Sequence, residues 1–198
     1  MLTTRSVSRI IDQLLANREG AAEWSAKGDD FRVSVNLTAI DLLDLELPDR
    51  LEALLAERGV AGESLCIELT ESTVMADPDR ARSVLERMAA IGVRISVDDF
   101  GTGHSSLAYL KDLPVDELKI DRSFVSGIAV SEHDRKIVQA TIHLAHSLGF
   151  EVVGEGVERR EVRDLLEEFC CDVGQGYFYG RPEPAELVSQ SPWVRQAA

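Results

Sequence analysis

The sequence predicts an α/β fold, a modified TIM-type (βα) barrel that is incomplete, with about six βα units and an N-terminal helix. Short runs rich in Val, Ile and Leu alternate with amphipathic helical patterns, which is typical of a largely parallel sheet. A complete barrel of eight units takes about 250 residues, so six strands in 198 residues leave roughly two units unaccounted for. The predicted strands cover 32–37, 65–69, 94–98, 117–120, 151–154 and, more weakly, 172–175.

Glycines and capping residues set the limits of the predicted helices. Apolar residues recur at helical spacing over 7–15, 51–55, 81–91, 137–148 and 162–169. Three of these patterns stop at a glycine, namely Gly59, Gly92 and Gly149. Asp77 before Pro78 is typical of an N-cap and first helical turn, and Ser131 with Asp134 resembles a capping box. The pattern over 7–15 is a helix where a βα barrel would begin with a strand.

The composition favours a single domain over residues 1–198, with a core at about 5–187 and a C-terminal tail at 188–198. Hydrophobic residues make up 44% of the chain and charged residues 28%, which is enough to bury one sizeable core. The formal net charge of -14 argues against a nucleic acid polymer as partner, because such surfaces need an excess of Lys and Arg. An anionic substrate would therefore need local help, such as metal ions.

Cysteine usage and hydropathy favour a cytoplasmic protein without a membrane segment. Cys66, Cys170 and Cys171 are odd in number and two are adjacent, which suits reduced thiols better than a disulfide framework. No run approaches the roughly 18 apolar residues that a membrane span requires. The first thirty residues contain no apolar stretch of the signal-peptide kind.

Polar side chains stand at or just beyond the ends of the predicted strands, where parallel α/β folds place their active sites. They are Asn36, Glu68, Asp98, Asp99, Lys119, Asp121, Glu155 and Gln175. The first three are 32 and 30 residues apart, about one βα unit each, so neighbouring strands would bring them to one rim. Two carboxylates 4 Å apart repel by about 4 kcal/mol at an effective dielectric of 20, so the cluster must share protons or bind cations. Oxygen ligands favour Mg²⁺ or Mn²⁺, and the Asp98-Asp99 doublet can serve two such ions.

These residues also have ordinary structural interpretations. A lone acid is often a solvated surface group or a helix cap. For Asn36, which follows a predicted strand, a capping or turn role is nearly as typical as metal ligation. Lys119 lies in an apolar run and needs a buried anion, while Asp98 and Asp99 would be a costly buried charged pair without partners. The histidines form no convincing ligand set and are interpreted as surface groups; they are His104, His133, His143 and His146.

The segment Asp99-Phe100-Gly101-Thr102-Gly103 is typical of a glycine-containing turn after a strand. Its Asp-Phe-Gly triplet also occurs in protein kinases. That interpretation fails, because no Gly-rich loop, strand-lysine motif or His-Arg-Asp catalytic loop accompanies the triplet. The sequence also lacks a P-loop and a Gly-x-Ser-x-Gly nucleophile elbow.

Four blocks of the sequence together resemble EAL-domain cyclic di-GMP phosphodiesterases. They are VSVNL at 33–37, ELTE at 68–71, DDFGTGHSSLAYLKDLPVDELKIDRSFV at 98–125, and GEGVE at 154–158 followed by QGY at 175–177. The resemblance runs in order from about residue 5 to about residue 187. It implies a modified βα barrel and metal-dependent hydrolysis of cyclic di-GMP to linear pGpG.

The same resemblance implies a catalytic centre with two divalent ions, Mg²⁺ or Mn²⁺. Asn36, Glu68 and Asp98 would be ligands of the first ion, and Asp98 with Asp99 would reach the second. Lys119 and Glu155 would position and deprotonate the attacking water.

Further positions would support this centre by the same resemblance. Asp121 and Gln175 look like supporting or substrate-binding residues. Glu71 resembles a carboxylate that braces the loop from Phe100 to Ser106. That loop lies near the dimer contact of the family, which implies a homodimer through the residues after Asp99.

The chain departs from the family pattern at its beginning. The Glu-Ala-Leu segment that names the family, with a metal-binding glutamate and a substrate-contacting arginine after it, is expected upstream of this sequence. Minor differences, none of which removes a ligand, are Thr38, His104, Gly154 and Cys170. Three hypotheses follow: an active hydrolase; a catalytically impaired EAL-like module that binds cyclic di-GMP or a protein partner without turnover; and a chain whose true start lies upstream. The retained site residues favour the first, and the missing segment favours the other two.

Overall fold

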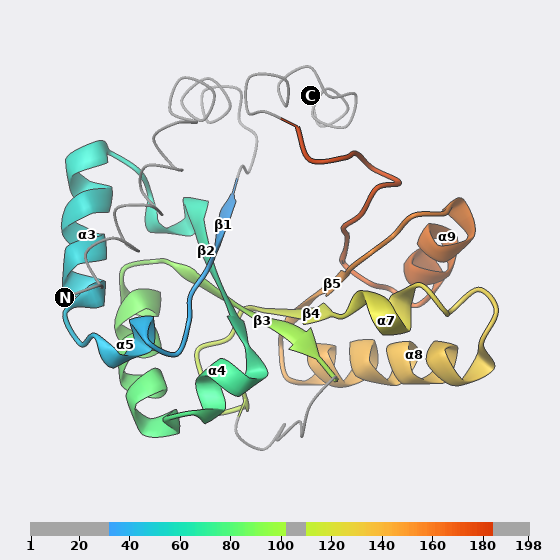
Figure 1. The fold of residues 1–198 in the computed structure, drawn as a ribbon, viewed down its shortest axis with the longest axis horizontal. Helices are drawn as coiled ribbons and strands as arrows, with labels where there is room; N and C mark the ends of the chain where they lie inside the picture. Colours follow the sequence, from blue (N-terminus) through green and yellow to red (C-terminus); the bar gives the residue numbers. More distant parts are fainter. Residues whose placement is uncertain (1–31, 102–109, 184–198) are drawn as a thin grey trace. The chain divides into compact units, whose positions relative to one another are not determined.

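Six strands and the helices between them make up the residues that the structure describes, 32–101 and 110–183 of a computed structural model (Figure 1). The strands are β1 (Val33–Asn36), β2 (Leu65–Thr70), β3 (Arg94–Phe100), β4 (Glu117–Ile120), β5 (Glu151–Gly154) and β6 (Val173–Gly174). They form one sheet in the order β1-β2-β3-β4-β5-β6, as successive parallel βα units do. This confirms the predicted α/β fold and its six strands. The helix predicted at 7–15 and the tail at 188–198 lie outside the described residues.

The described residues divide into two compact units. The first unit contains residues 32–67, 77–94 and 182–183, and the second contains 68–76, 95–101 and 110–181. The single domain expected from the composition stays a prediction. None of the helices in these ranges is long and apolar enough to cross a membrane.

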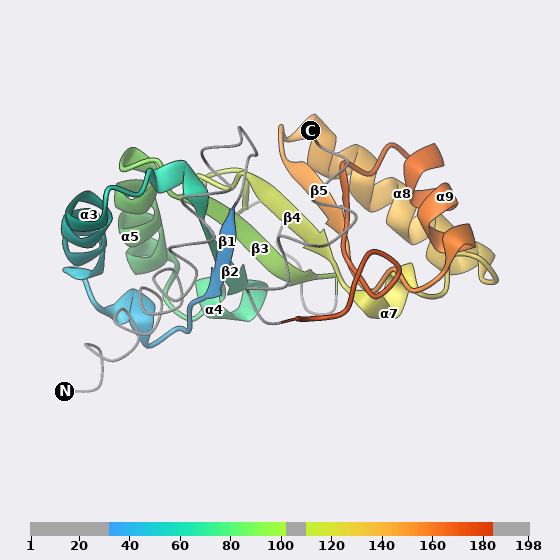
Figure 2. The same cartoon turned by 90° about the horizontal axis from the view of Figure 1, so that it is seen from above.

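The first unit packs α3 (Leu47–Arg58) against α5 (Pro78–Ala90), which lie side by side in Figures 1 and 2. Leu51 of α3 and Val84 and Leu85 of α5 are at most 2% exposed. Burying each of these side chains stabilises the fold by about 1.5–3 kcal/mol relative to leaving it in water. The apolar faces predicted from helical spacing are therefore the faces that form this core.

The ends of these helices follow the capping residues in the sequence. The carboxylate of Asp77 accepts a hydrogen bond from the backbone N–H of Arg80 at 3.3 Å, and Pro78 occupies the first turn of α5. Gly59 ends α3 with a φ of 64°, the left-handed conformation that glycine adopts without strain. Both predicted boundaries are confirmed.

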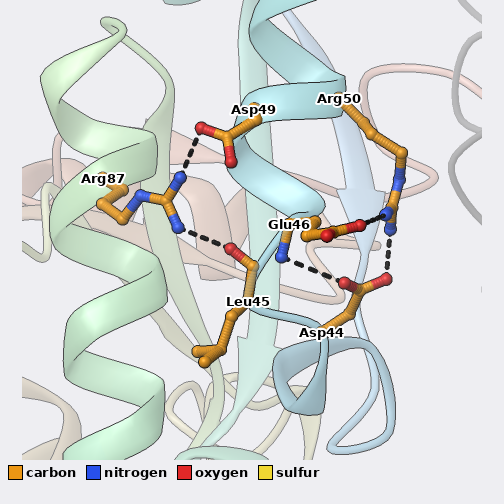
Figure 3. A network of polar contacts seen from close by, with 6 residues as sticks. All are labelled: Asp44, Leu45, Glu46, Asp49, Arg50 and Arg87. Atoms are coloured by element: carbon orange, nitrogen blue, oxygen red, sulfur yellow. Dashed lines mark hydrogen bonds and ion pairs between the residues drawn. The ribbon is translucent and has the colours of Figure 1, made fainter.

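Arginine side chains tie the start of α3 to α5 within the first unit (Figure 3). The guanidinium of Arg87 on α5 donates to the backbone carbonyl of Leu45 and pairs with the carboxylate of Asp49 on α3. Arg50 pairs in the same way with Asp44, at the end of the short helix η1 (Asp41–Leu43). Ion pairs at a protein surface contribute little to stability, so these contacts fix the orientation of the side chains more than they hold the unit together.

The second unit contains the central parallel strands with α8 (Glu132–Ser147) and α9 (Arg160–Glu168). Val97 of β3 pairs with Leu118 of β4, which pairs with Val152 of β5. All three side chains are at most 1% exposed. Apolar pairs of this kind are expected where a parallel sheet is covered by helices.

Two short helices after strands were not predicted from the sequence. They are α4 (Glu71–Met75), which follows β2, and α7 (Arg122–Val125), which follows β4 and lies beside α8 (Figure 1). The hydroxyl of Thr70 caps α4, and the carboxylate of Asp121 caps α7. Helices of four or five residues are too short to show a helical period in the sequence. The helix α4 begins at the candidate site residue Glu71, and α7 begins directly after the candidate site residue Asp121.

Candidate active site

Lys119 is the centre of a cluster of charged side chains within the second unit. Its Nζ atom lies 2.6 Å from Oε1 of Glu155 and 3.3 Å from Oε2 of Glu68. A third carboxylate oxygen, Oδ1 of Asp98, lies 3.4 Å from the same nitrogen. Lys119 belongs to β4, Glu68 to β2 and Asp98 to β3, and Glu155 directly follows β5. The structure thus brings together four of the residues that the sequence placed at strand ends.

The burial of this cluster makes its charges interdependent. The Lys119 side chain is 5% exposed, and those of the three acids are 12–19% exposed. Burial disfavours the ammonium, but the hydrogen bond to Glu155 and the charges of Glu68, Glu155 and Asp98 together raise the pKa of Lys119. Burial also raises the pKa of Glu155, against the opposing effect of Lys119. Lys119 lies in an apolar run and was expected to need a buried anion, and these carboxylates meet that need.

Asp98 and Asp99 lie in different surroundings, at a point where β3 is irregular. The pairing of β3 with β4 shifts between Val97 and Phe100, and Asp99 has a φ of 57°. Asp98 is partly buried and contacts Lys119, whereas Asp99 is exposed. The expectation of a buried aspartate pair is therefore wrong for Asp99, which is exposed at the irregular end of β3.

The carboxyl of Asp99 still lies in the electrostatic field of the cluster. Partial desolvation of the carboxyl is the largest effect that raises the pKa of Asp99, although the residue as a whole is exposed. The negative charges of Asp98 and Asp121 raise this pKa further. The positive charge of Lys119 opposes this shift. Asp99 thus adds negative charge beside Asp98, and it interacts electrostatically with Lys119.

Asp121 and Gln175 have clear structural partners in the second unit. The Asp121 carboxylate accepts hydrogen bonds from the hydroxyl and the backbone N–H of Ser123, which lower its pKa. Gln175 directly follows β6, and its backbone N–H donates to the carbonyl of Gly154 at 2.9 Å. Its own carbonyl accepts from Val157 at 3.0 Å. Their supporting roles in the site stay predictions.

The remaining predicted site residues are Asn36, Glu71 and the loop after Asp99, and each is described within its own element. Asn36 is the last residue of β1 in the first unit and is exposed, so its role as a ligand stays a prediction. Glu71 is buried as the first residue of α4. The loop that it is predicted to brace begins with Phe100 and Gly101, but Thr102 to Ser106 lie outside the described residues.

The donor chemistry of the cluster fits a hard divalent cation, but its present geometry does not form a cage. Three carboxylates against one ammonium leave an excess of negative charge at strand ends. Within 32–101 and 110–183, however, no three Asp, Glu, His or Cys side chains are arranged to hold a metal ion. The carboxylates converge on the Lys119 nitrogen instead.

A histidine contact missed at the sequence level lies elsewhere in the second unit. Nε2 of His146, near the end of α8, donates to Oδ2 of Asp172 at 2.7 Å. The same carboxylate oxygen accepts from the backbone N–H of Val152 at 2.8 Å. The interpretation of His146 as a plain surface group is therefore incomplete, because it ties α8 to the segment before β6. The two residues are 26 positions apart, so no local pattern indicates the pair.

A Glu-Ala-Leu tripeptide does occur in the chain, at 52–54, apart from the four blocks that carry the resemblance. These residues lie in the middle of α3, and Glu52 is exposed. A glutamate on the solvent side of a helix cannot do what the resemblance assigns to the family segment, which is to place a metal ligand in the catalytic centre. The tripeptide is therefore part of the amphipathic pattern of α3.

The fold and the cluster define an α/β protein with a carboxylate and lysine site at the carboxyl ends of parallel strands. Residues 4–182 match the family model described as EAL domain. The chain belongs to the EAL-domain family.

Two curated relatives from Pseudomonas aeruginosa illustrate the relationship. The bifunctional diguanylate cyclase/cyclic di-GMP phosphodiesterase MucR is 43% identical over 162 residues, which are 82% of this chain and 24% of MucR. The cyclic di-GMP phosphodiesterase NbdA is 44% identical over 159 residues, which are 80% of this chain and 20% of NbdA. The chain thus spans about a fifth to a quarter of the length of these relatives.

Solved structures with bound ligands share the fold. The cyclic di-GMP complex of the PaMucR phosphodiesterase matches with a TM-score of 0.84 and 37% identity, over 94% of this chain and 74% of that one. A manganese and cyclic di-GMP complex of Klebsiella pneumoniae BlrP1 matches with a TM-score of 0.72 and 30% identity. That match covers 77% of this chain and 39% of BlrP1.

Proposed function

We propose that this chain is the catalytic part of a metal-dependent phosphodiesterase that hydrolyses cyclic di-GMP to linear pGpG. The observation that carries the proposal is the convergence of Glu68, Asp98 and Glu155 on Lys119, at 2.6–3.4 Å. Membership of the EAL-domain family, with relatives that are named cyclic di-GMP phosphodiesterases, supports this substrate.

The residues divide into ligands and groups that act on water. Glu68 and Asp98, together with Asn36, would hold the first Mg²⁺ or Mn²⁺, and Asp98 with Asp99 would hold the second. When bound, the ions would supply positive charge against the phosphodiester and make the attacking water more acidic. The excess negative charge of the cluster supports cation binding, since an acidic protein needs such help to hold an anionic substrate.

Lys119 and Glu155 have different parts in this proposal. A protonated lysine has no free lone pair, so it can orient a water or a phosphate oxygen but cannot take up a proton. The carboxylate of Glu155 can accept one, and its contact with Lys119 at 2.6 Å fixes its position. Glu155 is therefore the proposed general base, and Lys119 is the residue that orients the reacting groups.

The test is turnover by the purified 198-residue chain. Cyclic di-GMP is incubated with the protein and either Mg²⁺ or Mn²⁺, and pGpG is separated by chromatography, with a chelator as the control. We expect pGpG to form only when the metal is present. Tight binding of cyclic di-GMP without product would reject hydrolysis by this chain.

A second candidate is a catalytically impaired EAL-like module that binds cyclic di-GMP or a protein partner without turnover. It is favoured by the finding that the described residues contain no group of three side chains arranged to hold a metal ion. The two candidates differ in one measurement, because calorimetry would detect cyclic di-GMP binding in both, while pGpG forms only in the first.

The setting of this activity is also proposed. Cys66, Cys170 and Cys171 form no disulfide bond with one another, which suits the reducing cytoplasm. A homodimer through the loop after Asp99 is a further expectation, for which analytical ultracentrifugation of the chain is the direct test. The proposed small-molecule partner is cyclic di-GMP and not a nucleic acid polymer, in keeping with the net charge of -14.

A further inference from the structure

The turn after β5 carries Glu155, the proposed base, and its backbone is anchored on two sides. The backbone N–H of Glu155 donates to the carbonyl of Ile120, the last residue of β4, at 3.1 Å. Two residues later, the backbone N–H of Val157 donates to the carbonyl of Gln175 at 3.0 Å. The residue between these two anchors is Gly156.

Gly156 leaves room for the side chain of Arg122, the first residue of α7. It has a φ of 69°, a left-handed conformation that glycine adopts without strain. A Cβ atom on this residue would lie 2.7 Å from Cβ and 2.8 Å from Cδ of Arg122, and closer still to Cγ. Non-bonded carbon atoms do not approach so closely. The aliphatic stem of Arg122 therefore lies against the backbone of Gly156 and fills the space of a side chain there.

The guanidinium of Arg122 reaches beyond Gly156 to the end of the same turn. Its Nη2 atom lies 2.8 Å from Oε1 of Glu158. The two side chains are 60% and 44% exposed, so this ion pair contributes little to stability. Its effect is on orientation, because it keeps the stem of Arg122 stretched across Gly156. The side chain of Arg122 thus spans the turn from Gly156 to Glu158.

We propose, resting on the function above, that Arg122 is a positioning residue for Glu155. By holding the adjacent turn, it keeps the carboxylate of Glu155 at 2.6 Å from Nζ of Lys119. Lys119 and Arg122 are three residues apart, at the end of β4 and the start of α7. One short segment thus holds the proposed base twice, through its side chain and through its backbone. Arg122 acts through Glu155 and is not itself a catalytic residue.

This role has a different kinetic effect from that of a plain surface ion pair. A general base must lie within hydrogen-bond reach of the water from which it takes a proton. Loss of the residue that positions it therefore slows the chemical step and leaves substrate binding as it was, so kcat falls while KM stays. An ion pair that only decorates the surface would affect neither quantity.

The first test is a pair of substitutions at position 122 in the 198-residue chain, with pGpG formation from cyclic di-GMP measured at saturating Mn²⁺. Arg122→Ala removes both the stem and the charge, and we expect kcat to fall by about tenfold or more with KM unchanged. Arg122→Lys keeps an aliphatic stem and a positive charge, and it should restore most of kcat. Circular dichroism checks that both variants are folded.

The matched control is Arg163→Ala on α9, which removes an arginine whose contact with Glu167 is of similar length, 2.9 Å. It should leave kcat and KM unchanged. If Arg122→Ala turns over cyclic di-GMP at the normal rate, the positioning role is rejected and the proposed hydrolase stands. If the unmodified chain forms no pGpG, the hydrolase is rejected, and the part of Arg122 in turnover is rejected with it.

A second measurement follows the turn itself and requires neither metal nor turnover. Amide hydrogen exchange of Glu155, Gly156 and Val157 is measured by NMR in the presence of chelator. We expect these amides to exchange about tenfold faster in Arg122→Ala, because the turn opens more often without the side chain across it. Arg122→Lys and Arg163→Ala should exchange at the rate of the unmodified chain. An unchanged rate in Arg122→Ala would overturn the proposal, whatever the turnover.

Discussion

The Nζ atom of Lys119 lies closer to Oε1 of Glu155, at 2.6 Å, than to the oxygens of Glu68 or Asp98. The two residues come from adjacent positions of the sheet, since β4 and β5 pair in parallel up to Ile120 and Gly154. Glu155 directly follows that last pair, so the register of two strands sets the contact. A rigid sheet therefore holds the proposed base.

Glu155→Gln removes the proposed base while it keeps the size and a hydrogen-bonding oxygen. Loss of a general base lowers turnover by about 10²–10⁴-fold, so we expect pGpG formation to fall in this range with cyclic di-GMP binding retained. Chromatography and calorimetry measure the two quantities. The control is Glu158→Gln, which affects a more exposed carboxylate paired with Arg122. Equal loss in both variants would count against a specific role for Glu155.

Asp98→Ala removes a proposed ligand of both ions. We expect metal-dependent turnover to fall below detection while the circular dichroism spectrum is retained, because Lys119 keeps two of its three anions. Asp164→Ala, on the exposed side of α9, should leave turnover unchanged. If Asp98→Ala turns over cyclic di-GMP at the normal rate, the assignment of the site is wrong.

The contact between His146 and Asp172 predicts that the stability of the folded protein decreases at acidic pH. Although partial burial opposes it, the hydrogen bonds from His146 and the backbone of Val152 lower the pKa of Asp172. A carboxyl with a lower pKa in the folded state stabilises the protein above its unfolded pKa of about 3.9 and loses this effect as the pH falls through the folded value.

Asp172→Asn should therefore lower the free energy of unfolding by about 1 kcal/mol at pH 7, a modest amount because the carboxylate is partly exposed. The difference from the unmodified chain should shrink as the pH falls below about 4. Urea unfolding across this range measures it. A difference that is constant with pH would show that the charge of Asp172 is not its source.

The adjacent thiols of Cys170 and Cys171 should differ in reactivity. Burial raises the pKa of Cys171 to about 11, whereas Cys170 is exposed. Since only the thiolate reacts, and burial both disfavours it and limits access, Cys171 should be alkylated at pH 8 far more slowly than Cys170. Mass spectrometry after timed exposure to iodoacetamide measures both rates. Cys170→Ser should remove the fast reaction, and a fast reaction that remains would contradict this assignment.

The sequence predicted the strands and the main charged cluster because both leave local signals. Lys119 stands out as a cation inside an apolar strand. Because an unpaired buried charge is costly, the sequence predicts that buried anions lie near this lysine. The strand positions follow from β-rich runs and from glycines at helix ends, such as Gly59.

Other parts of the site have no local signal. Nothing in the letters Asp98-Asp99 shows that the pairing of β3 with β4 becomes irregular here, because such irregularities depend on the neighbouring strand. The contact of His146 with Asp172 joins residues from separate βα units. Helices as short as α4 and α7 are fixed by their caps and by the strands before them.

The left-handed backbone of Asp99 limits which amino acids can occupy this position. Glycine, asparagine and aspartate adopt the conformation readily, while other residues pay roughly 1–2 kcal/mol. Of the three, aspartate alone carries a charge. Geometry thus narrows position 99 to a few amino acids before any selection for chemistry, and a survey of natural variation here would have to separate these two causes.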